Sequence, residues 1–195
     1  LATSLRDLVM RVGDLGGELT DLSAATGIGT TAIQNIGFAF QKSGVETEEY
    51  HSGLRKMIDT LGDGVKAARF VGTLGKGASG FAQALKATKD PAQQLELILA
   101  QMASIESPAK RAAFASIFFG KAGVKMAAAA ADGADGLKRM RREAEALGQV
   151  MTEDEIKRAD EFSDTYESLG MVLEGSKRGF ASGLIEGLLP AMQDL

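Results

Sequence analysis

Recurring helix-start signals constrain the fold of this chain more than any other feature of its sequence. Asp90 and Ser107 each place a side-chain acceptor directly before a proline, as is typical of a helix N-terminus. Thr152 opens the run Thr-Glu-Asp-Glu, which has the pattern of a capping box with acids in the first helical turn. No stretch combines strand alternation with hairpin turns. We therefore predict an all-α protein, a multi-helix hairpin bundle with a long C-terminal helix.

Apolar residues at spacings of three and four predict further helices before these signals. The predicted helices run from Leu5 to about Ala25, from Thr30 to Ser43, and onward from about Thr47. Three glycines, at positions 13, 16 and 17, are expected to weaken the middle of the first helix. Aromatic residues make up only 6% of the chain and glycine occurs 24 times, so we expect closely packed helices.

Glycine and proline positions divide the chain into four predicted parts. Residues 1–61 form N-terminal helices with a helix-turn-helix-like hairpin, and residues 62–89 form a Gly-rich connector. Residues 90–148 form helical hairpins bounded by Pro and Gly. Helix C-termini are predicted at Gly44 in the first part and at Gly148. Residues 149–195 form the long C-terminal helix.

The near-absence of histidine and cysteine excludes most catalytic chemistry. With one histidine and no cysteine, the chain offers no thiol nucleophile, no disulfide and no usual zinc ligand set. We predict that it is not an enzyme and has no catalytic residue, no cofactor and no metal. We expect His51 on a helix surface, the basic cluster at 138–142 on a solvated face, and a flexible loop, not a phosphate site, at 72–80.

Charge and hydropathy argue against two further classes of partner. The net charge of −4 predicts no specific nucleic-acid partner. No uninterrupted run of 18 uncharged apolar residues exists, so we predict no transmembrane helix.

The first residue is Leu1 and no signal peptide pattern follows it. We expect the chain to be an internal segment of a longer protein or a processed product.

A stripe of glycines at every fourth position marks the C-terminal helix. It comprises Gly175, Gly179, Gly183 and Gly187, with Phe180 and Leu184 on its flank. Bare helix faces let a second backbone approach closely, so we hypothesise that residues 170–192 mediate self-association. Two alternatives remain open: a weak, glycine-broken helix end, and a membrane-active segment, against which Glu186 argues.

A second pattern lies just before that stripe. Phe162, Tyr166, Leu169 and Leu173 alternate spacings of four and three, which is the seam of a coiled coil. Two turns of seam are too few to establish one.

The order of three segments and the chain end resembles a known family. Residues 22–57 pass from a Thr-Gly-Ile corner into a helix ending in Ser-Gly and then an acidic helix. Residues 90–123 carry two Pro-capped helices and the corner Phe-Gly-Lys-Ala-Gly, and residues 133–169 carry a Leu-Gly turn before an acid-capped helix. The chain ends in LLPAMQDL. In this order they resemble the phage tail tape measure protein family, least so over residues 62–88.

The resemblance implies a structural role in a phage, a prophage or a related tail-like particle. Proteins of that family occupy the tail tube lumen in several copies, set tail length during assembly and leave the tube at genome ejection. The implied partners are tail tube proteins, tail initiator or baseplate proteins, tail assembly chaperones and further copies of the same chain. The implied location is the virion tail lumen, and the host cytoplasm during assembly. The alternative function is a membrane-active helical segment, pore-forming or secreted, with transient membrane contact.

A length-setting role raises a question about the state of the chain. A helix from Thr152 to Leu189 would span about 57 Å, at about 1.5 Å per residue, whereas folded hairpins span less length per residue. We hypothesise that the segment is compact in the free protein and opens into an extended bundle inside the tail.

Overall fold

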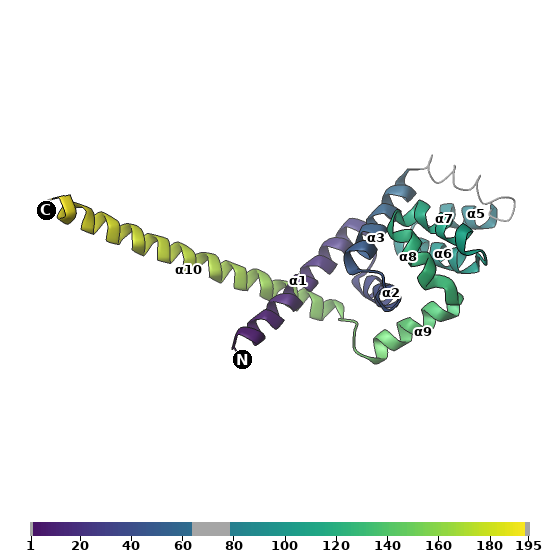
Figure 1. Cartoon of the computed structure of the whole chain (residues 1–195), viewed down its shortest axis with the longest axis horizontal. Coiled ribbons are helices and arrows are strands. Elements are labelled where there is room, and N and C mark those ends of the chain that lie inside the picture. The colour runs from purple at the N-terminus through teal and green to yellow at the C-terminus, as the bar shows by residue number, and fades with distance from the viewer. Residues whose placement is uncertain (1, 64–78, 194–195) are drawn as a thin grey trace. The chain divides into compact units, whose positions relative to one another are not determined.

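The computed structural model describes residues 2–63 and 79–193, and these residues form helices and carry no strand (Figure 1). The predicted all-α fold with a long C-terminal helix is therefore confirmed. The chain divides into two compact units. One, the bundle unit, contains residues 18–153, and the other, the α10 unit, contains residues 1–17 and 154–195.

The described helices follow one another along the chain. They are α1 (Ala2–Thr26), α2 (Thr30–Lys42), α3 (Thr47–Gly62), α5 (Ser79–Ala87), α6 (Pro91–Ser104), α7 (Pro108–Phe119), α8 (Ala122–Ala129), α9 (Gly133–Ala146) and α10 (Glu153–Gln193). A 3₁₀ turn, η2 (Ala130–Asp132), joins α8 to α9. Most of the predicted Gly-rich connector, residues 64–78, lies outside the described residues.

The helix starts confirm the capping signals in the sequence. The Asp90 carboxylate accepts a hydrogen bond from the Ala92 N–H at 3.0 Å, and Pro91 occupies the first position of α6. The Ser107 hydroxyl accepts from the Lys110 N–H at the start of α7. At α3, Glu46 and Glu49 form a reciprocal capping box. These local bonds satisfy N–H groups that have no partner inside the helix.

Two predicted glycine C-caps are also confirmed. Gly44 follows α2 with φ +83°, and the next N–H, of Val45, donates to the Phe40 carbonyl at 3.0 Å. Gly148 follows α9 with φ +63°, and the Gln149 N–H donates to the Ala144 carbonyl at 3.0 Å. Both are Schellman motifs, in which a left-handed residue turns the chain out of the helix.

Aromatic side chains fill the core of the bundle unit at two places. Phe118 of α7 is fully buried and its ring meets Phe81 of α5 edge-on, with ring centroids 6.4 Å apart. Between α2 and α3, the Tyr50 ring packs on Phe40, and its hydroxyl donates to the Ile33 carbonyl at 3.0 Å. Burying each ring removes a large apolar area from water, and the Tyr50 hydroxyl keeps its hydrogen bond.

The expected close packing of helices is most pronounced between α7 and α8. A Cβ atom added to Gly123 would lie 2.4 Å from the Ala115 carbonyl carbon and oxygen. Glycine is thus required at this position for the two helix backbones to touch.

Polar contacts join α2 to α9 and to the segment that follows α9. Gln34 of α2 binds the backbone of Met151 twice, accepting from its N–H at 2.8 Å and donating to its carbonyl at 3.0 Å. Lys42 pairs with Glu143, but both side chains are nearly half exposed, so this ion pair adds little stability. The Gln34 bonds therefore position the segment that leads into α10.

Candidate functional site

Within the α10 unit, α1 and α10 cross through small residues. A Cβ atom added to Gly13 of α1 would lie 2.6 Å from the Ser163 Cβ of α10. One added to Gly16 would lie 3.0 Å from the Ile156 carbonyl oxygen and 3.2 Å from the Ala159 Cβ. The glycines expected to weaken α1 do not interrupt it and form this contact. The Gly-x-x-Gly spacing is the signal that could have revealed the contact from sequence.

This close crossing leaves the α10 unit with little apolar core among its described side chains. Ile156 is 2% exposed, but six other large apolar residues of the unit are 38% to 67% exposed. The exposed set is Val12, Leu15, Phe162, Leu169, Met171 and Val172. These residues lie on two helices, α1 and α10, and leave apolar surface in contact with water.

Three members of this exposed set, Phe162, Leu169 and Val172, lie on α10 together with the half-buried Tyr166, and we call these four residues the apolar seam. Phe162 is 50% exposed, Leu169 57% and Val172 65%. The Phe162 and Tyr166 rings stack along the helix with centroids 6.4 Å apart. Three of these residues belong to the coiled-coil pattern in the sequence, and the side chain of the fourth member of that pattern, Leu173, lies outside the described residues.

The predicted glycine stripe falls within the span of α10. At Gly175 an added Cβ would meet no atom within 4 Å. The surroundings of Gly179, Gly183 and Gly187, and the side chains of Phe180 and Leu184, lie outside the described residues. Self-association through the stripe therefore stays a prediction.

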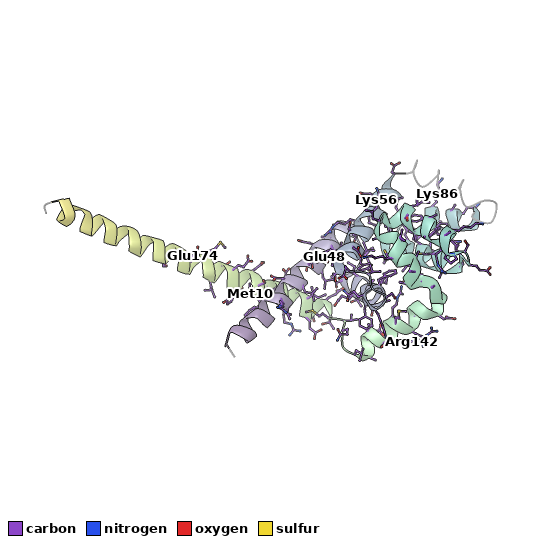
Figure 2. The ribbon with its side chains drawn as sticks, in the orientation of Figure 1. Met10, Glu48, Lys56, Lys86, Arg142 and Glu174 are labelled. Atoms are coloured by element: carbon purple, nitrogen blue, oxygen red, sulfur yellow. The ribbon has the colours of Figure 1, made fainter. Side chains whose placement is uncertain are left out.

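The basic residues of the α9 cluster fall into two groups, one paired and one exposed. Arg141 pairs with Glu96 of α6. Lys138, Arg139 and Arg142 are exposed, and Figure 2 labels Arg142 on this helix. Their exposure agrees with the predicted solvated face.

His51 was expected on a helix surface, and the structure corrects this. Its side chain is 4% exposed, on the buried face of α3, with its ring 5.7 Å from that of Tyr50. Burial lowers the pKa of His51, an effect that Arg55 reinforces and that Glu18 and Glu48 oppose. The neighbouring Tyr50 phenol has its pKa raised, chiefly by burial. Both side chains are therefore neutral parts of the core.

The buried histidine predicts an acid-sensitive bundle unit. Because its pKa lies below the ordinary value of 6.5 in the folded chain, the unfolded chain takes up the proton first. The stabilising contribution is thus complete above about pH 6.5 and is lost as the pH falls through the lowered pKa. Urea unfolding between pH 5 and 7.5 should show stability declining toward acid, and His51→Gln should flatten that decline.

A matched variant tests the cause of this dependence. Glu18 raises the pKa of His51, so Glu18→Gln should lower it further and steepen the loss of stability in acid. Since His51 is the only histidine of the chain, an unchanged slope in His51→Gln would contradict the assignment.

No site for metal chemistry is evident in the described part of the chain. There, no three His, Asp or Glu side chains gather as a metal ion would require. Among the helices described, none combines the length and hydropathy needed to cross a membrane. The glycine segment 72–80 falls outside the described residues except for Ser79 and Gly80, which begin α5.

Comparisons with protein-family models, with curated proteins and with solved structures found no match for this chain.

Proposed function

We propose that this chain is a structural segment of a phage or prophage tail tape measure protein. One observation carries the proposal: the order of the segments 22–57, 90–123 and 133–169, which resembles that family. The helix boundaries within these segments lie at the capping and glycine signals on which the resemblance depends. The all-α architecture is compatible with the same role.

In this role the segment sets tail length during assembly and occupies the tail tube lumen until the genome is ejected. Its partners are tail tube proteins, tail initiator or baseplate proteins, tail assembly chaperones and other copies of the chain. It acts as a scaffold and not as an enzyme.

Helix α10 supplies the property that a ruler needs, a constant rise per residue. Its 41 residues span about 60 Å, at about 1.5 Å per residue. The bundle unit, residues 18–153, is compact and spans less length per residue. In our proposal this unit opens into extended helices inside the tail, so that both parts contribute length.

Deletions in the gene of the intact particle test the proposal. Removing residues 164–191, which are 28 residues of α10, should shorten the tail by about 42 Å in electron micrographs. Removing residues 91–118, an equal number spanning α6, its connection to α7 and most of α7, should shorten it by the same amount if the bundle unit opens.

The control replaces residues 164–191 with an unrelated helical sequence of equal length, which should preserve tail length. Unchanged tails in both deletions would contradict the ruler role. Shortening by the α10 deletion alone would leave the ruler role in place and show that the bundle unit stays folded.

A further inference from the structure

We propose that α9 and the connector behind it form a releasable strap on the bundle unit, latched to α2 by the side chain of Gln34. The α9 strap comprises residues 133–151. Release means that this segment leaves α2 and α6 while the other helices of the bundle unit stay packed. The inference goes beyond the tail role and does not depend on it.

The α9 strap lies at one edge of the bundle unit, where its main helix contacts are with α2 and α6 (Figure 1). The turn η2 precedes it and is anchored by the fully buried Ala130. Gly148, with φ +63°, turns the chain at the other end of α9. Because α9 is bounded by a turn at each end, it can leave its neighbours without unwinding another helix.

The described side chains of the α9 strap bury little apolar surface. Ala144 is the one apolar side chain that is buried in the described part of the strap, and Leu147 is 59% exposed. Helix α7, by contrast, buries the rings of Phe114, Phe118 and Phe119. Hydrophobic stabilisation grows with the apolar area removed from water. On the described side chains, releasing α9 therefore exposes far less apolar surface than releasing α7.

Polar groups dominate the described contact, and two of their atoms are poorly satisfied there. The Asn35 amide nitrogen donates to Glu145 at 3.4 Å, and Arg141 pairs with Glu96. Yet Asn35 Oδ1 and Arg141 Nε are buried without a hydrogen-bond partner among the described residues. A buried polar atom without a partner opposes the packed state, because water would satisfy it after release. The attachment of α9 is therefore weak for its length.

Gln34 holds the end of the α9 strap with both groups of its side-chain amide. Its Oε1 accepts from the Met151 N–H at 2.8 Å, and its Nε2 donates to the Met151 carbonyl at 3.0 Å. The same Nε2 also donates to the Thr30 carbonyl of its own helix at 3.2 Å, which orients the amide. One side chain thus fixes both polar backbone groups of Met151, and its loss removes both bonds together.

Hydrogen exchange of the full 195-residue chain, read by mass spectrometry, tests the proposal. A released helix of 14 residues is marginal in water, so its amides exchange once it leaves α2. In wild type, α9 amides should exchange about tenfold or more faster than α7 amides. Gln34→Ala should accelerate α9 by about a further tenfold and leave α7 unchanged.

Gln41→Ala is the matched control for that variant. Gln41 lies on the same helix as Gln34, but its amide donates to Thr47 of α3. This variant should leave the exchange of α9 as in wild type. Far-UV circular dichroism should show that both variants keep their helix content.

Limited digestion with trypsin detects the same opening through a different readout. The exposed residues Lys138, Arg139 and Arg142 place trypsin sites inside α9, and a helix must unfold locally before it is cut. Cleavage there should precede cleavage at Lys125, which is exposed on the packed helix α8. It should also be faster in Gln34→Ala than in Gln41→Ala.

Equal exchange of α9 and α7 in wild type would overturn the proposal, because α9 would then open only when the whole bundle unit unfolds. This comparison needs no variant, so it decides even if Gln34→Ala fails to fold. A folded Gln34→Ala that accelerates both helices equally, or neither, would also overturn it, as would the same acceleration of α9 by Gln41→Ala.

Discussion

Replacing Phe118 by alanine is expected to lower the free energy of unfolding of the bundle unit by about 4 kcal/mol. The Phe118 ring is fully buried and contacts three other phenylalanine rings, of Phe81, Phe114 and Phe119. Its removal loses the transfer free energy of the ring and leaves a cavity between α5 and α7 that packed neighbours cannot close. Part of the loss is the edge-to-face contact with Phe81, which holds α5 to α7.

Thermal unfolding followed by circular dichroism would measure this loss. A change of this size in a unit of this length corresponds to a midpoint lower by roughly 10–15 °C. Leu147→Ala is the control, because Leu147 is exposed and its truncation should change stability by less than about 0.5 kcal/mol. A shift as small as that of the control would show that Phe118 is not central to the core.

Gly123→Ala is expected to lower the stability of the bundle unit by about 3 kcal/mol, although alanine is the better helix former. The new methyl group would lie 2.4 Å from the Ala115 carbonyl and 2.6 Å from the Ser116 nitrogen. Both are backbone atoms of α7 and cannot rotate away. The two helices would have to separate, which disturbs the buried side chains around them.

Gly62→Ala separates this clash from the general effect of adding a methyl group. Gly62 ends α3 and an added Cβ there meets no atom within 4 Å. The substitution should be neutral or stabilise by up to about 1 kcal/mol, through the higher helix propensity of alanine. Urea unfolding of both variants measures the difference, and equal stability of the two would rule out a backbone contact at Gly123.

Much of the helical architecture could be predicted because it depends on interactions between near neighbours in sequence. Asp90 binds an N–H two residues away and Ser107 one three residues away, and Gly44 ends α2 through bonds within a single turn. Such bonds form wherever the local sequence allows them, whatever the rest of the chain does.

Burial and contact partners could not be predicted in the same way. His51 lies among polar residues in sequence, yet the packing of α3 turns its ring into the core. Gly13 and Gly16 looked like helix-weakening residues, because only α10, almost 150 residues later, gives them a partner. The burial of His51 depends on the orientation of the whole of α3, and the glycine contacts depend on a segment that is distant in sequence. Local sequence patterns do not contain that information.

By itself, then, the sequence determined where several helices begin or end, as at Asp90, Ser107 and Gly44, and excluded thiol chemistry, through short-range bonds and residue content. Only the tertiary structure decided which helix faces meet. It placed Gly123 and Gly13 at close crossings, buried His51, and left Phe162 and Leu169 in solvent. The physical reason is that burial is a property of two surfaces together, whereas a cap or a helical period belongs to one segment.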